Sequence, residues 1–320
     1  MSDRASLIRA CLALLLSAGS GAVCAGDLRF CEQPAQLDAG QQDKLLRFTA
    51  LVKHELERSG HGVALVARAG TELGRFGMRY SHAGFALKGS ENTPWSVRQL
   101  YYACDQAKPR LYDQGLSGFL LGANSKEVAF LSVLLLPQPQ SSQLERAALD
   151  RRQALSVLAQ DYSANAHAFS TRYQNCNQWV LELMASVFGN LGSAHPSEDS
   201  AGSAPLSTQD LRAQAQGWLQ ARAYQPAVFE LGFRPVLWVA AAAIPWVHND
   251  DHPRTDLQAA RYRVSMPASI EAFVQTALPG AQRLEFCQTQ QHVLLRRGWV
   301  PGLAADCQPQ AGDELLRLDD

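Results

Sequence analysis

A cysteine and a histidine stand where they could act as a nucleophile and its base. Cys176 falls at the start of a predicted amphipathic helix, within the run YQNCNQW at 173–179. A thiol at this position benefits from the helix dipole and from unpaired backbone N–H groups, which favour the thiolate. His82 comes earlier, in the strand-like run YSHAGF at 80–85. A histidine on a neighbouring strand would complete a nucleophile–base pair, which predicts a thiol hydrolase or acyltransferase.

The roles of the two residues follow from thiol chemistry. His82 would hold Cys176 as a thiolate and then protonate the leaving group, while backbone N–H groups at the helix start face the oxyanion. A third group must orient the imidazole from the adjacent strand, which nominates Gln99, with Ser96 and Arg98 behind it.

Each of the two principal residues also has an ordinary structural explanation. Cys176 fits a small buried hydrophobe or one half of a disulfide, and His82 taken alone fits a hydrogen-bonded histidine on an apolar strand. The helix start, the polar neighbours Asn175 and Asn177, and the cysteine count favour the nucleophile.

The first 25 residues have the features of a secretory signal. Arg4 and Arg9 form a weakly basic start, residues 10–23 are apolar and small, and the small-x-small triplet at 23–25 precedes Gly26. The apolar stretch is too short to span a bilayer. Lipidation after cleavage before Cys24 is the alternative to a soluble mature form. The sequence therefore predicts an exported protein with no transmembrane segment after signal cleavage.

Cysteine arithmetic supports an unpaired thiol. Five cysteines follow the signal, and an odd number in an oxidising compartment leaves one free thiol or an intermolecular bridge. Cys287 could pair with Cys307 and Cys31 with Cys104, which leaves Cys176 over, although four cysteines allow three connectivities.

Composition bounds the size and excludes one class of partner. Removal of the signal leaves about 295 residues, enough for one large domain or two small ones. The formal net charge of −1 gives no reason to expect nucleic-acid binding. The motifs imply no cofactor.

Periodicity predicts helices and strands in separate blocks, the pattern of an α+β fold. Helices are expected at 38–59, 144–158, 175–188 and 211–223, and strands at 63–67, 79–87, 95–103 and 128–136, with a short extended stretch at 168–173. The strands at 79–87 and 95–103 are expected to pair, and Tyr80, His82 and Gly84 to share one face. Residues 191–209 are rich in Ser, Ala, Gly and Pro, which predicts a flexible linker. The expected organisation is a signal peptide at 1–25, a core at 26–190, the linker, and a C-terminal region at 210–320 packed on the core.

Here the motifs resemble a known superfamily. A strand-borne histidine in SHAGF followed much later by a helix start NCNxW resembles the circularly permuted papain-like thiol hydrolases, which are relatives of the NlpC cell-wall peptidases and of lecithin retinol acyltransferase. The resemblance implies a papain-like fold with a small antiparallel sheet packed on helices, a periplasmic location, and a peptidoglycan peptide or lipid acyl group as substrate. The chain is also similar to an uncharacterised group of secreted proteobacterial proteins, over 74–84, 95–118, 173–179 and 246–253.

Two further histidines are candidate metal ligands. His248 and His252 are four residues apart, and on a helix they would share a face that could take zinc. Pro253 and the intervening Asn-Asp-Asp favour a turn instead, and the motif lacks the glutamate of a His-Glu-x-x-His protease. A solvated or hydrogen-bonded loop is the favoured interpretation.

The sequence thus favours an exported thiol hydrolase or acyltransferase that forms an acyl-Cys176 intermediate with His82 as base. The alternative from another class is a non-catalytic periplasmic binding or envelope-assembly module on a degenerate hydrolase fold. The near-neutral charge does not choose between the substrate classes.

Overall fold

The structure is a computed structural model that describes residues 37–70, 73–122, 128–192 and 206–317. The predicted signal peptide, Cys31, and residues 193–205 of the predicted linker lie outside these ranges. The described residues belong to one compact unit.

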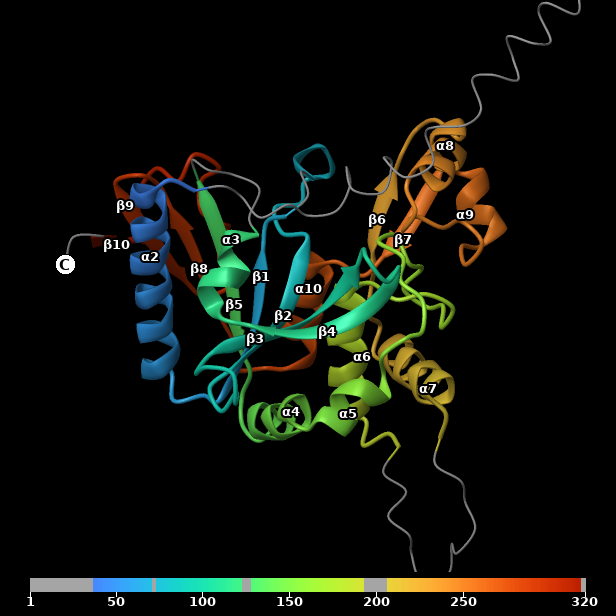
Figure 1. Ribbon diagram of the computed structural model, residues 1–320, viewed down its shortest axis with the longest axis horizontal. Helices are drawn as coiled ribbons and strands as arrows, with labels where there is room; N and C mark the ends of the chain where they lie inside the picture. Colours follow the sequence, from blue (N-terminus) through green and yellow to red (C-terminus); the bar gives the residue numbers. More distant parts are fainter. Residues whose placement is uncertain (1–36, 71–72, 123–127, 193–205, 318–320) are drawn as a thin grey trace, which may run out of the picture. The chain divides into compact units, whose positions relative to one another are not determined.

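An antiparallel eight-stranded sheet is the centre of this unit (Figure 1). Its strand order is β10-β9-β8-β5-β1-β2-β3-β4, from β1 (Val63–Arg68), β2 (His82–Leu87), β3 (Ser96–Ala103), β4 (Lys108–Gln114), β5 (Ala129–Leu135), β8 (Gln282–Gln288), β9 (His292–Arg297) and β10 (Glu314–Arg317). The α+β prediction is confirmed. The expectation of a small sheet is wrong, because the C-terminal region adds β8, β9 and β10 to the strands of the core.

Helices cover both faces of the sheet. The helices of the described residues are α2 (Ala39–Arg58), α3 (Leu116–Leu121), α4 (Gln140–Leu149), α5 (Arg151–Ser156), α6 (Cys176–Phe188), α7 (Thr208–Ala221), α8 (Pro235–Ala243), α9 (Arg254–Gln258) and α10 (Pro267–Ala277), with a 3-10 turn at Gly74–Phe76. Of these, α2 and α3 pack on one face of the sheet, and α4, α6 and α10 pack on the other. The first predicted helix begins as expected, with Asp38 and Gln41 forming a capping box. The helix expected at 144–158 is instead two helices, because Asp150 is extended and caps α5.

Two hydrophobic clusters lie on opposite faces of the sheet. In β1, Val63, Leu65 and Ala67 join the cluster that includes α4, α6 and α10, whereas Ala64 and Val66 join the cluster that includes α2 and α3. A strand buried on both faces is apolar throughout, which is why 63–67 lacks the alternation of a half-exposed strand.

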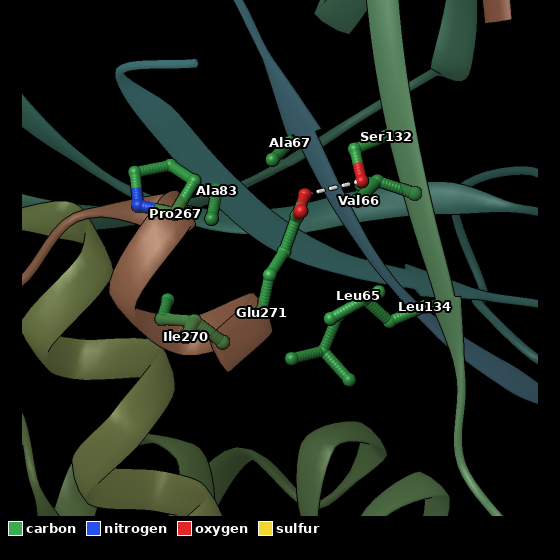
Figure 2. A pocket seen from close by; sticks show the side chains of 9 residues that line it. All are labelled: Leu65, Val66, Ala67, Ala83, Ser132, Leu134, Pro267, Ile270 and Glu271. Atoms are coloured by element: carbon green, nitrogen blue, oxygen red, sulfur yellow. Dashed lines mark hydrogen bonds between the residues drawn. The ribbon is translucent and has the colours of Figure 1, made fainter. Parts of the chain in front are cut away.

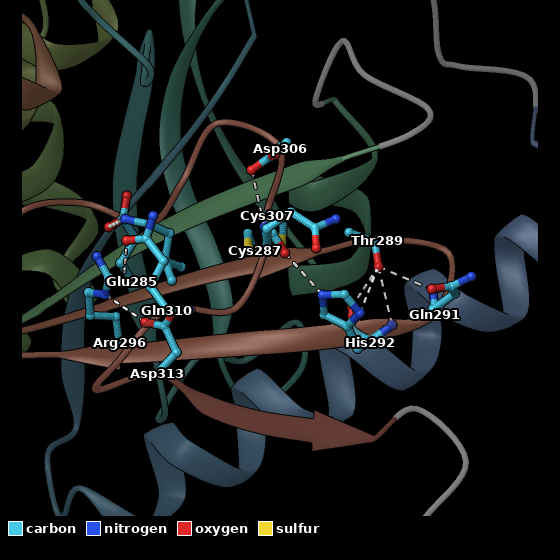
Figure 3. Close-up of a disulfide and its surroundings, with 12 residues drawn as sticks. Glu285, Cys287, Thr289, Gln291, His292, Arg296, Asp306, Cys307, Gln310 and Asp313 are labelled. Atoms are coloured by element: carbon cyan, nitrogen blue, oxygen red, sulfur yellow. Dashed lines mark hydrogen bonds and ion pairs between the residues drawn. A yellow bond between two sulfur atoms is a disulfide. The ribbon is translucent and has the colours of Figure 1, made fainter.

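A disulfide ties the C-terminal loop to the sheet. Cys287 in β8 is bonded to Cys307, and the His292 ring in β9 donates from Nε2 to the Cys307 carbonyl at 3.0 Å (Figure 3). This pairing was one of those expected from the sequence, and it is confirmed.

A smaller substructure lies between α7 and α10 in the chain. The antiparallel pair β6 (Ala227–Glu230) and β7 (Arg261–Val264) carries α8 and α9 (Figure 1). Its hydrophobic cluster includes Leu237, Tyr262 and Met266.

Three segments differ from the elements predicted from the sequence: the strand that carries His82, the stretch at 168–173, and residues 108–121. The strand begins at His82 rather than Arg79, so Tyr80 lies outside it and joins the cluster on the α6 face. The stretch at 168–173 forms turns rather than a strand. The sequence assigned no element to 108–121, where the structure has β4 and α3.

Candidate active site

Three adjacent strands carry a chain of side-chain hydrogen bonds that ends on His82. The His82 ring in β2 pairs through Nε2 with Gln99 Oε1 in β3 at 2.7 Å. Gln99 Nε2 in turn donates to Gln114 Oε1 in β4 at 2.8 Å. Gln99 is fully buried, so its amide has little competition from solvent. The structure therefore brings together two of the three predicted site residues and adds Gln114, which sequence reasoning missed because β4 was not recognised.

The hydrogen bonds from His82 through Gln99 to Gln114, called the relay below, set the tautomer of the imidazole. Because Gln99 donates through Nε2, its Oε1 must accept, so the His82 Nε2 carries a hydrogen. In neutral imidazole this leaves Nδ1 as the unprotonated nitrogen. The sequence predicted that Gln99 orients the His82 imidazole, whereas the roles of the two ring nitrogens come from the structure.

Burial and a nearby cation keep His82 neutral. Desolvation first, and then the Arg68 guanidinium, lower its pKa from 6.5 to about 3, against the smaller opposing effect of the Gln99 hydrogen bond. The ring also packs against Tyr101 and Phe119, with centroids 4.8 and 6.0 Å away. A neutral imidazole can accept a proton during a reaction, but it does not form a standing ion pair with a thiolate at neutral pH.

Gly84 makes room for the relay. A Cβ at this position would lie 2.8 Å from the Arg98 carbonyl oxygen and 3.1 Å from Gln99 Cβ. Both distances are shorter than ordinary contacts, so β2 and β3 approach closely only because residue 84 has no side chain. The glycine of the SHAGF run therefore has a packing reason next to His82.

Cys176 is the first residue of α6, as the sequence predicted. Asn175 caps the helix by accepting from the Gln178 N–H at 2.8 Å. The Cys176 side chain is buried and takes part in no disulfide. Cys104 is disulfide-bonded, while Cys31, the partner expected for it, lies outside the residues that the structure describes.

The start of α6 is tied to the start of β2. Asn177, next to Cys176, donates from Nδ2 to the carbonyl of Ser81, next to His82, at 3.0 Å. The two side chains nevertheless have different surroundings. Cys176 belongs to the cluster on the α6 face, whereas Phe119, which the His82 ring contacts, belongs to the opposite cluster. The hydrogen bonds of His82 to other described residues do not include one to Cys176.

Two buried amide oxygens belong to the residues that follow Cys176 in α6. Asn177 Oδ1 and Gln178 Oε1 are buried and have no hydrogen-bond partner among the residues described. Buried polar atoms are nearly always paired, so these two acceptors are unusual; the nitrogens of the same amides donate to the Ser81 carbonyl and to carbonyls at 167–170.

A buried ion pair holds α6 in place from its other side. Arg212 in α7 donates from Nε to Glu182 Oε2 at 2.7 Å, and both side chains are inaccessible to solvent. Gln174 and Gln216 also donate to Glu182, and Arg212 donates to the Tyr173 carbonyl at 2.8 Å. These bonds link α6, α7 and the segment just before Cys176.

The family model described as "Uncharacterized protein conserved in bacteria (DUF2145)" matches residues 55–274. The chain belongs to this family. His82, Gln99 and Cys176 all fall inside the matched region, whereas the disulfide between Cys287 and Cys307 falls beyond it. No curated protein and no solved structure matches the chain.

The residues predicted to stand behind Gln99 do not enter the relay. Arg98 points to the other face, where it pairs with Asp113 at 2.6 Å and donates to the Ala148 carbonyl at 2.6 Å. Ser96 Oγ accepts from the Asn92 side chain at 3.1 Å. Both residues hold β3 and its neighbours in place.

The His248–His252 segment is a turn, as favoured from the sequence. His248 stacks on Tyr173 with ring centroids 4.3 Å apart, and His252 donates from Nε2 to the Asn165 carbonyl at 2.9 Å. Desolvation is the main cause that lowers the pKa of His252 to about 4. Within the described ranges no three His, Cys, Asp or Glu side chains are grouped as metal ligands would be.

A cavity of about 10 Å³ between β1, β5 and α10 is too small for a substrate, since it has room for about one water. Ser132 Oγ donates across it to Glu271 Oε1 at 2.5 Å (Figure 2). Glu271 also accepts from Arg283 Nε at 3.0 Å, so this polar group joins α10 to the sheet.

Proposed function

We propose that the protein is a thiol hydrolase or acyltransferase that cleaves an amide or ester through an acyl-Cys176 intermediate. The Cys176 sulfur forms a bond to the carbonyl carbon of the substrate while its proton passes to His82 Nδ1. The tetrahedral intermediate then expels the amine or alcohol, which takes that proton from His82. Water or an acceptor nucleophile releases the acyl group and regenerates the thiol.

The observation that carries the proposal is the relay from His82 through Gln99 to Gln114. It fixes the imidazole with Nδ1 able to accept a proton, and it does so on the strand whose start is hydrogen-bonded to the start of α6. His82 is the first residue of β2, so the proposed proton transfer requires the Cys176 sulfur to reach His82 Nδ1 past the start of that strand. A thiol outside any disulfide, at a capped helix start, supplies the nucleophile.

The substrate classes come from the resemblance to permuted papain-like enzymes. A peptidoglycan peptide and a lipid acyl group both offer the carbonyl that this chemistry needs, and a periplasmic protein would meet either.

Thiol reactivity tests the proposal directly. Free thiols of the purified oxidised protein are counted, and iodoacetamide labelling of Cys176 is followed against pH in wild type and in His82→Ala. Because His82 is neutral, we expect it to assist labelling as a general base while Cys176 is still a thiol, so labelling should fall in His82→Ala between about pH 4 and the ordinary thiol pKa of about 8.5. His54→Ala, at an exposed position of α2, is the matched control and should label like wild type.

A second candidate is the non-catalytic binding module. One observation favours it. Cys176 belongs to the hydrophobic cluster on one face of the sheet, whereas the His82 ring contacts Phe119 of the cluster on the other face. In that case Cys176 labels slowly and identically in wild type, His82→Ala and His54→Ala, and the enzyme proposal fails.

A further inference from the structure

The α8 surface is an apolar patch that the described residues leave exposed. We define the α8 surface as Phe233, Val236, Trp238 and Val239, which are 64%, 43%, 60% and 66% exposed, together with the cations Arg234 and Arg254. Leu237 is the one residue of α8 that is buried. A helix that is apolar all round is normally enclosed by protein or lipid, so this surface needs an occupant.

Unpaired cations border the apolar side chains. Neither Arg234 nor Arg254 forms an ion pair with any residue that the structure describes. Asp250 is the acidic residue of the adjoining cavity, and its charge is already paired with Arg172 at 2.6 Å. The patch is therefore apolar and positively charged.

A cavity lies next to α8. It has a volume of about 590 Å³, and its lining includes Arg234 and Trp238 from the α8 surface, Arg254 and Leu257 from α9, and His252. This volume lies within the range of small-ligand sites, about 300–1,000 Å³. His252 is 7% exposed, and its Nδ1 has no hydrogen-bond partner among the described residues. A headgroup-sized ligand between the two arginines would meet their positive charge, while His252 Nδ1 is an acceptor because Nε2 donates to the Asn165 carbonyl.

The chemistry of the patch selects among occupants. A symmetric contact with a second copy would bring the same patch to itself, so the arginines would face like charges without acidic partners. An anionic lipid surface supplies what is missing, because phosphates pair with guanidinium groups and acyl chains accept Val, Phe and Trp side chains. The nine residues of α8 are roughly 14 Å long, far less than the about 30 Å of a hydrocarbon core, so the helix would lie in the interface. Within the described ranges, no helix has the length and apolar character needed to cross a membrane.

We propose that the α8 surface docks the protein on an anionic lipid membrane. Phe233, Val236 and Val239 enter the acyl-chain boundary with the exposed edge of Trp238, and Arg234 and Arg254 bind lipid phosphate at the mouth of the cavity. This inference does not depend on Cys176 chemistry.

The test is co-sedimentation of the purified protein with vesicles of phosphatidylcholine, with or without phosphatidylglycerol. The protein is purified without detergent and its N-terminus is determined by mass spectrometry. Wild type is expected to bind the anionic vesicles, and to bind them less as salt rises. Phe233→Ser with Val239→Ser should lower the partition constant about tenfold or more, since two exposed apolar side chains no longer enter the bilayer.

The arginines have their own variant and the patch has matched controls. Arg234→Gln with Arg254→Gln should remove most of the preference for phosphatidylglycerol, a loss of about tenfold or more. Leu46→Ser with Leu155→Ser changes two similarly exposed apolar residues on other helices and should leave binding unchanged. Circular dichroism spectra of all variants confirm that they are folded.

Three results would overturn the proposal. Wild type could fail to bind anionic vesicles, or the α8 variants could bind as well as wild type. Alternatively, light scattering could show that wild type is a dimer that does not bind vesicles and that the Phe233→Ser, Val239→Ser variant is a monomer. A second copy of the chain would then be the occupant of the α8 surface. Loss of vesicle binding would leave Cys176 labelling unchanged, so this inference and the proposed function fail separately.

Discussion

Gly84→Ala is the substitution that tests the geometry of the relay most sharply. The added Cβ would lie 2.7 Å from Val97 Cγ1, 2.8 Å from the Arg98 carbonyl oxygen and 3.1 Å from Gln99 Cβ. The Val97 methyl can rotate away, but the carbonyl belongs to the backbone of β3 and cannot. Restoring ordinary contact therefore requires β2 and β3 to separate by about half an ångström.

The expected cost is that of overpacking a buried strand pair. Inserting a methyl group into a well-packed region destabilises by about 1–3 kcal/mol. Because Gln99 Cβ is among the atoms displaced, the 2.7 Å hydrogen bond from His82 to Gln99 should lengthen as well. We therefore expect a lower free energy of unfolding. We also expect a shift in the tautomer equilibrium of the His82 imidazole, because the hydrogen bond to Gln99 favours the tautomer protonated at Nε2.

Urea unfolding at neutral pH measures the first effect and nitrogen chemical shifts of the His82 ring measure the second. Gly217→Ala is the matched control. Gly217 lies inside α7 with no atom within 4 Å of the place its Cβ would take, so this change should stabilise by about 0.5–1 kcal/mol. If Gly84→Ala is as stable as wild type and leaves the His82 shifts unaltered, the close approach of β2 and β3 is not as described.

The other predictions concern charge, ion pairing and cross-linking. The pKa of His82 is about 3 in the folded protein and 6.5 in the unfolded chain, so the free energy of unfolding should fall as pH falls from 6.5 towards 3. In His82→Gln the urea midpoint should depend less on pH over this range. Equal pH dependence in wild type and variant would contradict the buried neutral ring. Arg212→Ala should lose about 3–5 kcal/mol in urea unfolding because it leaves the Glu182 charge buried, whereas joint replacement of both by Met and Leu should cost much less. Replacing Cys287 and Cys307 by Ser should lower stability by about 3 kcal/mol, the effect expected for a loop of this length, and an unchanged melting temperature would show that the bond does not restrain the unfolded chain.

Local sequence signals located much of the fold because the physics behind them is local. The capping box of Asp38 and Gln41 depends on residues three apart, and the start of α6 at Cys176 depends on its Asn175 cap. The strand at 95–103 and its pairing with 79–87 followed from alternation and short spacing, and the structure confirms that pairing. The turn at 248–252 followed from its Asn, Asp and Pro content.

Local sequence patterns did not predict the pairing of strands that are far apart in the chain, nor the strand β4. The strand β4 is half-exposed at the edge of the sheet and includes Lys108 and Pro109, so it has little of the apolar pattern that marks a strand. The addition of β8 next to β5 joins segments about 150 residues apart, and no periodicity within either segment specifies that contact. The size of the sheet was therefore underestimated.

The sequence by itself determined which residue types can do chemistry here and which local elements carry them. A cysteine at a helix start, a histidine on an apolar strand and a glutamine on the next strand are all readable from spacing, because capping and strand alternation depend on neighbours in the chain. Only the tertiary structure decided that Gln99 bonds to His82 and that Gln114 extends the relay, since those contacts depend on the register of three strands. It also decided that Cys176 and the His82 ring contact opposite clusters, because a sheet separates its two faces whatever the order of residues along the chain.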